Sequence, residues 1–220
     1  MLVELGIADR DGTGNARFGL EENVGLVPVT VTPVSGGGFF TWLTAARVPE
    51  LGAAVPSKEI LAEILGIAAD DILEDERDRP CAYSAGLPFL FVPLRDRSVL
   101  QRVVLDLARW RETIAHSWAK DVYVFCHEGA GEVDIRARMF APAAGITEDP
   151  ATGSAAAALA GYLWRRKGSG GRWIVAQGVE MGRPSILHIE AQEEDGILRT
   201  VRVGGSAVRV SHGTLNLGVP

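Results

Sequence analysis

A short acidic segment directly before a strongly helical run is the part of the sequence best suited to chemistry. It reads Glu-Asp-Pro-Ala-Thr-Gly-Ser over residues 148–154. Pro150 fixes its own φ and disfavours helical geometry at Asp149, so this carboxylate is held at a defined point before the helix. A carboxylate placed in this way can hydrogen-bond a ligand or exchange a proton with it.

The residues after the proline are suited to the start of a helix. Thr152 is a good N-cap residue, Gly153 lets a ligand approach the backbone, and Ser154 adds a hydroxyl. The first amides of a helix have no partner within it and lie at the positive end of its dipole. The segment therefore predicts a site for a carboxylate or another anion. A plain capped helix is the alternative, which accounts for Thr152 but not for the whole string, and both interpretations stay open on these residues alone.

The helix that follows is expected to span residues 154–166 and has an unusual composition. Its first part, residues 155–161, consists of alanines, one leucine and one glycine. A helix on the protein surface would show a polar face, whereas small residues on all sides allow neighbours to approach all round. We therefore expect a central helix enclosed by a curved sheet.

The remainder of the chain is predicted to be rich in strands. Alternating or apolar runs bounded by turn residues predict strands at 16–20, 24–32, 39–45, 85–94, 121–126, 132–140, 173–177, 185–191, 198–203, 207–210 and 214–217. Helices are expected over 57–65 and around 99–109. The acidic stretch 69–79 marks a solvated connection, and we place the domain boundary there, with residues 1–72 in one domain and 73–220 in the next.

Composition excludes several classes of protein. The 220 residues are 47% hydrophobic and carry a formal charge of −6, and the compact basic cluster 165–167 is better explained by the end of a helix than by nucleic-acid binding. The two cysteines and four histidines show no metal-ligand spacing. No apolar run is long enough to span a membrane. We expect a cytoplasmic protein that binds neither nucleic acid, membrane nor metal.

Several strings, taken in order, resemble the phenazine biosynthesis-like (PhzF-like) isomerases, which are relatives of diaminopimelate epimerase. The most specific is the string EDPATGSAAAALAGYL, residues 148–163. The others are SAGLPF at 84–89, RMFAP at 138–142, QG at 177–178 with MGRPS at 181–185, and VGGSA at 203–207. Together these strings span nearly the whole chain.

This resemblance implies a fold, a type of reaction and a set of site residues. The fold is α+β and diaminopimelate epimerase-like, with two domains that each wrap a curved, mostly antiparallel sheet around a central helix. Family members move a proton on a small carboxylic acid without a cofactor, and we expect a homodimer. By position, Asp149 would be the catalytic acid of the second domain, while Thr152, Gly153 and Ser154 would bind the substrate, the last two by holding its carboxylate.

The sequence also departs from the family pattern in its first domain. The expected general-base glutamate and a Gly-His-Ala motif are absent, and residues 1–6 resemble the end of the first domain's central helix. We therefore expect a complete second domain and a partial first domain. The last residues of the chain could return to the first domain. Two hypotheses follow: an isomerase represented by an N-terminally truncated chain, or a non-catalytic module that binds a small carboxylate or a protein partner.

Overall fold

A computed structural model describes residues 3, 6–129, 131–208, 211–214 and 218. The strands are β1 (Ala16–Glu22), β2 (Gly25–Pro33), β3 (Phe39–Thr44), β4 (Glu50–Leu51), β5 (Cys81–Ser84), β6 (Pro88–Pro93), β7 (Asp121–His127), β8 (Ile135–Ala141), β9 (Ile146–Asp149), β10 (Gly171–Gln177), β11 (Ser185–Glu194) and β12 (Ile197–Ser206). The helices are α1 (Lys58–Leu65), α2 (Arg97–Arg102), α3 (Leu107–Thr113) and α4 (Gly153–Lys167), with short 3-10 turns η1 (Ala69–Asp71) and η2 (Pro142–Ala144).

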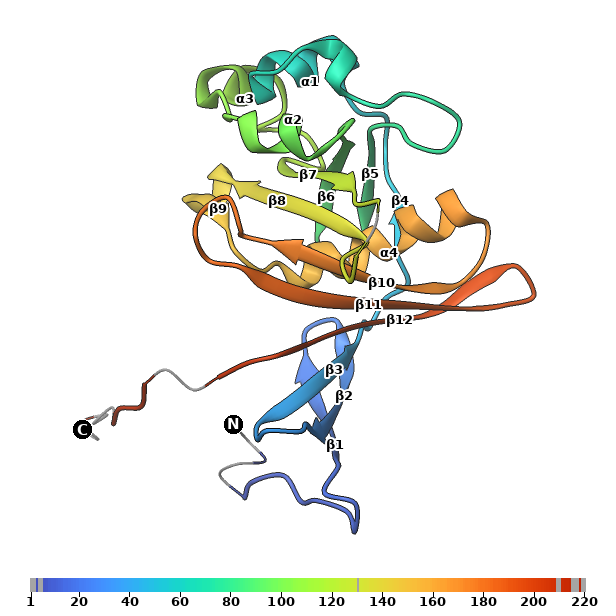
Figure 1. Cartoon of the computed structure of the whole chain (residues 1–220), viewed down its shortest axis with the longest axis vertical. Coiled ribbons are helices and arrows are strands. Elements are labelled where there is room, and N and C mark those ends of the chain that lie inside the picture. The colour runs from blue at the N-terminus through green and yellow to red at the C-terminus, as the bar shows by residue number, and fades with distance from the viewer. Residues whose placement is uncertain (1–2, 4–5, 130, 209–210, 215–217, 219–220) are drawn as a thin grey trace.

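The strands form a 12-stranded sheet in the order β1-β2-β3-β12-β11-β10-β8-β7-β6-β5-β4, with β9 paired to β8. Neighbours are antiparallel except for the pairs β6–β7 and β8–β10. The larger part of this sheet curls around α4, and the β1–β3 part extends away from it (Figure 1). The mostly antiparallel α+β architecture agrees with the predicted fold class.

Helix α4 lies inside the curl of the sheet, as its composition predicts. Every residue from Ala155 to Leu163 is buried, and the surrounding apolar side chains come from strands on both sides of the helix. Small side chains allow this close approach, because the sheet backbone must pack around the whole circumference of the helix. The approach is very close at Gly161, since a Cβ there would lie 2.6 Å from the Cβ of Pro49.

A second apolar layer covers the opposite face of the sheet. Helices α1, α2 and α3 pack on this face (Figure 1). Along β6, Phe89 and Phe91 join the core around α4, while Leu90 and Val92 join the core beneath the three helices. A strand covered on both faces needs a continuous apolar run, which explains the composition of this segment.

The β1–β3 part has its own small apolar cluster, formed by Val3, Ala16, Val29 and Val31. It joins the rest of the sheet through the pairing of β3 with the end of β12. The predicted strand at 207–210 lies partly outside the described residues. Most of the predicted strand at 214–217 and most of residues 1–6 lie outside them as well.

One predicted helix is wrong. Residues 99–109 do not form a single helix, because α2 ends at Arg102 and α3 begins at Leu107. Val103 leaves the helical conformation, with φ −57° and ψ 125°, and the carboxylate of Asp106 accepts hydrogen bonds from the amides of Ala108 and Arg109 at 2.9 and 3.0 Å. Asp106 is thus an N-cap that starts a second helix.

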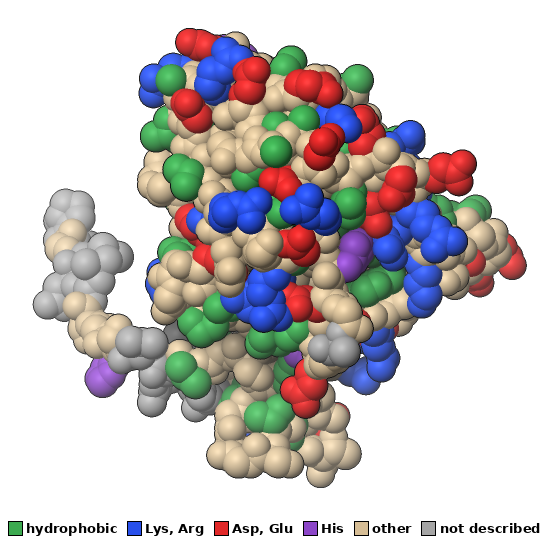
Figure 2. Space-filling view, turned by 45° about the horizontal axis from the view of Figure 1, so that its top comes forward, with side chains coloured by type: hydrophobic (Ala, Val, Ile, Leu, Met, Phe, Trp, Pro, Cys, Tyr) green, Lys and Arg blue, Asp and Glu red, His purple; other side chains and the backbone are tan. Residues whose placement is uncertain are grey.

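The surface mixes charges of both signs. Figure 2 shows acidic and basic side chains interspersed over the face in view, with apolar side chains between them. In the part of the chain that the structure describes, no helix combines the length and apolar character needed to cross a bilayer.

Candidate active site

A partly buried ion pair fixes the strand that ends at Asp149. Arg138 on β8 donates two hydrogen bonds to the carboxylate of Glu148 on β9, with N–O distances of 3.0 and 2.8 Å, and each side chain is 11% exposed. Nη1 of Arg138 also donates to the carbonyls of Leu100 and Val103 at 3.0 and 2.8 Å. This paired, bidentate geometry is among the strongest polar contacts in proteins, and it holds β9 against β8 and the end of α2.

Asp149 joins a hydrogen-bond network that continues into β10. The hydroxyl of Thr152 donates to Oδ2 of Asp149 at 2.5 Å. Nε2 of Gln177 donates to the carbonyl of Asp149 at 2.7 Å and to Oγ1 of Thr152 at 2.9 Å. Oε1 of Gln177 accepts from the hydroxyl of Tyr123 at 3.2 Å and from the amide of Thr152 at 3.4 Å. The turn between β9 and α4 is therefore held by two strands distant in sequence.

Thr152 occupies the N-cap position of α4, as predicted, but its side chain does not cap the helix. The hydroxyl is engaged by Asp149 and Gln177 instead. The helix start is consequently less satisfied than in an ordinary capped helix. The amides of Gly153 and Ser154 have no carbonyl four residues back within the helix. Both residues are exposed, and a Cβ on Gly153 would meet nothing within 4 Å.

The sheet divides next to this helix start. The pairing of β11 with β12 reaches His188 and Gly204 and goes no further. Residues 185–187 pair with β10, whereas residues 205–206 pair with β3. The two strands therefore diverge and leave a fork.

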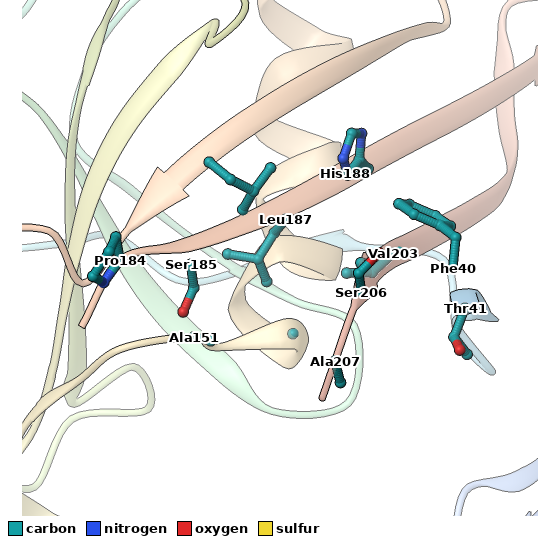
Figure 3. Close-up of a pocket in the computed structure, with 14 residues that line it drawn as sticks. Phe40, Thr41, Ala151, Pro184, Ser185, Leu187, His188, Val203, Ser206 and Ala207 are labelled. Carbon is teal, nitrogen blue, oxygen red and sulfur yellow. The ribbon is translucent and has the colours of Figure 1, made fainter. Parts of the chain in front are cut away.

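A cavity of about 720 Å³ occupies the fork and reaches Gly153 at the start of α4. Figure 3 shows Ala151 towards one end of the cavity and Phe40 and His188 towards the other. The rings of Phe40 and His188 meet edge to face with centroids 5.0 Å apart. Burial lowers the pKa of His188 below its ordinary value of 6.5, which favours the neutral imidazole at this end of the cavity.

Gly178 brings the backbone of the acidic segment close to the turn between β10 and β11. Its φ is +76°, and a Cβ there would lie 2.7 Å from the carbonyl oxygen of Pro150 and also against the carbonyl of Arg183. Because backbone atoms cannot move aside, only glycine fits. The Gln-Gly pair at 177–178 thus contributes both a hydrogen-bonding side chain and a close backbone contact.

The structure brings the four predicted site residues together at one helix start, in different settings. Gly153 lines the cavity, and Ser154 is exposed beside it. Thr152 is buried, and Asp149 is half-buried with its Oδ2 occupied. The sequence did not identify Gln177 as part of this site. The available signal was a polar amide directly after the apolar run 173–176.

A family model described as phenazine biosynthesis-like protein matches residues 5–213. The chain belongs to this family. An uncharacterized isomerase of Mesorhizobium japonicum is 36% identical over 211 residues, which cover 92% of this chain and 69% of the relative. For a relative from Deinococcus radiodurans, 32% identical, the match spans 62% of the relative's length.

Three further matches concern a named reaction and the fold. The trans-2,3-dihydro-3-hydroxyanthranilate isomerase of Pseudomonas chlororaphis is 42% identical over 99 residues, 44% of this chain and 35% of that protein. The crystal structure of a PhzF-family protein of Bacillus anthracis superposes with a TM-score of 0.81 at 22% identity, covering 96% of this chain and 70% of that one. A hydroxyproline epimerase of Agrobacterium vitis superposes with a TM-score of 0.56 at 13% identity, covering 93% of this chain and 60% of that one. The predicted family and the predicted epimerase-like fold are confirmed.

Proposed function

We propose that this chain forms one wall of the active site of an isomerase that moves a proton on a small carboxylic acid without a cofactor. Asp149 is the proton-carrying acid, and the backbone and hydroxyl at Gly153 and Ser154 hold the substrate carboxylate. The observation that carries the proposal is the placement of a half-buried carboxyl beside an open helix start that reaches a cavity.

The charge of the helix start is opposite to that of the proposed ligand. A helix start with free amides attracts a carboxylate, and the cavity volume of about 720 Å³ suits a small ligand. A carboxyl group within hydrogen-bond reach of the ligand can then transfer a proton. Relatives named as isomerases support this reaction class.

The proposed active site also has a second wall. The family's glutamate and Gly-His-Ala motif have no counterpart in the 220 residues, and the match covers 69% of the length of the Mesorhizobium relative. We infer that these groups lie on a segment outside this chain. A homodimer and a cytoplasmic location stay predictions; sedimentation and cell fractionation test them.

The decisive experiment measures solvent deuterium incorporation into trans-2,3-dihydro-3-hydroxyanthranilate and into other unsaturated or hydroxylated small acids. The assay is run on the 220-residue chain and on a longer chain extended by the upstream reading frame. We expect exchange in the extended chain and a loss of roughly 10²–10⁴-fold in Asp149→Asn, the range for removal of a general acid or base.

Asp195→Asn is the matched control, because Asp195 lies in the turn between β11 and β12, where its positive φ of 53° also suits asparagine. This control should retain full exchange. Undiminished exchange in Asp149→Asn would overturn the assignment of the acid. Carboxylate binding without exchange in either form of the chain would favour the non-catalytic binding module.

A further inference from the structure

Gln177 is the most completely used polar side chain near the candidate site. It is fully buried, with an exposure of 0%, and ends strand β10. Its amide makes four hydrogen bonds, two as donor and two as acceptor, to Tyr123, Asp149 and Thr152. A buried amide is costly unless satisfied, so this degree of satisfaction indicates a fixed orientation.

Two of the partners determine where the oxygen and the nitrogen of the Gln177 side-chain amide lie. The backbone amide of Thr152 can only donate, so it must face Oε1 of Gln177. The backbone carbonyl of Asp149 can only accept, so it must face Nε2. The reversed amide would set donor against donor and acceptor against acceptor. The orientation of Gln177 therefore follows from groups that cannot change their roles.

This orientation determines the hydroxyl proton of Thr152. Nε2 of Gln177 donates to Oγ1 of Thr152, so the single proton on Oγ1 is directed at Oδ2 of Asp149. The O–O distance of 2.5 Å lies at the short end of the range for a hydroxyl that donates to an ionised carboxylate. Oδ2 is thereby held as an acceptor. Among the described residues, Oδ1 of Asp149 has no hydrogen-bond partner.

We propose that Gln177 is a positioning residue that, through Thr152, reserves Oδ1 of Asp149 as the oxygen that exchanges a proton with the ligand. This assignment rests on the proposed function, because it concerns the same proton transfer. It goes further by naming the oxygen and the two side chains that select it. Oδ2 stays bonded to the Thr152 hydroxyl throughout, and the migrating proton is carried on Oδ1 alone.

Variants of Thr152 and Gln177 test this relay, the chain of hydrogen bonds that runs from Gln177 through the Thr152 hydroxyl to Oδ2 of Asp149. Thr152→Val keeps the shape and removes the hydroxyl, Gln177→Glu keeps the shape and removes the donors, and Thr152→Ser keeps the hydroxyl. Thr113→Val on α3 is the matched control, since within the described part of the chain that exposed hydroxyl bonds only the carbonyl of Arg109. The readouts are kcat and KM for solvent exchange in the extended chain, together with the 13C chemical shift of the Asp149 carboxyl at pH 7.

We expect Thr152→Val and Gln177→Glu to lower kcat by about 10–100-fold, the scale of a small misplacement of a reacting group, while KM changes by less than about 3-fold. Thr152→Ser should restore kcat to within about 3-fold, and Thr113→Val should change nothing. A wild-type kcat in Thr152→Val would overturn the relay. So would equal losses in Thr152→Val and Thr152→Ser, because a purely structural role predicts no rescue by the hydroxyl.

The carboxyl signal separates this inference from the proposed function. If no form of the protein exchanges deuterium, the proposed reaction fails, but the relay still predicts that the Asp149 carboxyl shift moves in Thr152→Val and stays in place in Thr113→Val. An unmoved shift in Thr152→Val would overturn the relay on its own.

Discussion

A side-chain carboxylate lies near each end of helix α4, and the surroundings of the two carboxylates are opposite in character. Near the C-terminal end, Asp78 is 4% exposed and is surrounded by partners. Its carboxylate accepts hydrogen bonds from Nε of Arg166 at 2.9 and 2.8 Å and from the hydroxyl of Tyr162 at 3.1 Å. Nε2 of His127 lies 3.1 Å from Oδ1 of the same carboxylate. Near the N-terminal end, Asp149 has one oxygen bonded to Thr152 and is only half-buried.

This difference distinguishes a carboxylate that stabilises the fold from a carboxylate that is available to a ligand. A carboxylate saturated by donors from the helix and the strands cannot take a ligand, so Asp78 fastens the acidic loop before β5 to the helix end. A carboxylate with a free oxygen, next to unpaired helix amides, is prepared to meet one. Stability should therefore depend strongly on the C-terminal end of the helix and weakly on the N-terminal one.

The largest effect is expected at Asp78. Burial alone would raise its pKa, but the hydrogen bonds from His127 and Arg166 outweigh burial and hold the pKa at about 2, below the ordinary 3.8. Asp78→Asn should lower the free energy of unfolding at pH 7 by about 2–4 kcal/mol, because hydrogen bonds to charged groups are lost in a buried setting. Chemical denaturation of both proteins measures this.

The pH dependence gives an independent check. Because the folded pKa is depressed, the stabilisation by Asp78 is fully present above pH 3.8 and is lost as the pH falls towards about 2. The gap between wild type and Asp78→Asn should therefore close over that window. Asp70→Asn is the control, since the Asp70 side chain is 97% exposed and should change stability by less than about 0.5 kcal/mol. A loss as small at Asp78 would refute the view that this end of the helix is a structural fastening.

A smaller effect is expected from two glycines on the same helix. Gly161 lies where a Cβ would meet Pro49 at 2.6 Å and the ring of Tyr83 at 2.9 Å, so Gly161→Ala should cost about 1–3 kcal/mol from overpacking. Gly153 faces open space, so Gly153→Ala should change stability by less than about 1 kcal/mol. Thermal unfolding measures both variants.

Ligand binding should respond in the opposite way to stability, since the substitution of Gly153 should weaken it and the substitution of Gly161 should not. A methyl group on Gly153 enters the cavity and should weaken the binding of a simple carboxylate such as benzoate, followed by NMR titration. Gly161→Ala, where it folds, should bind as the wild type does. Equal weakening in both variants would mean that the helix start has no special role.

Structure was predicted best from the sequence where the local composition of a segment depends directly on what surrounds it. The alanine-rich run that begins at Ala155 indicated an enclosed helix, because small residues on all sides suit only close neighbours on all sides. The single helix expected over 99–109 was wrong because the break depends partly on Arg138, which takes the carbonyl of Val103 from 35 residues further along the chain. A local sign of the break, Asp106 as an N-cap, was present in the sequence.

The hydrogen-bond network at the site could not be predicted in the same way. Tyr123, Asp149 and Gln177 lie on β7, β9 and β10, and no local pattern links them. Thr152 was expected to cap the helix, which is what its position alone favours, but Gln177 redirects its hydroxyl. The division of the chain into residues 1–72 and 73–220 stays a proposal, which limited proteolysis in the acidic connection would test.

A further small effect, of opposite sign, is expected at Asp121, a third carboxylate, which begins β7 on the same face as Tyr123. Its Oδ1 is buried without a hydrogen-bond partner among the described residues, and burial raises its pKa above 3.8. A raised folded pKa means that the charged form is penalised, so the penalty is absent below pH 3.8 and grows as the pH rises through the folded pKa. Asp121→Asn should therefore stabilise the protein at pH 7 by about 1 kcal/mol and leave it unchanged near pH 3. Unfolding temperatures across this range decide the matter: a variant less stable than wild type at pH 7 would mean that the Asp121 carboxylate has a partner and belongs with Asp78.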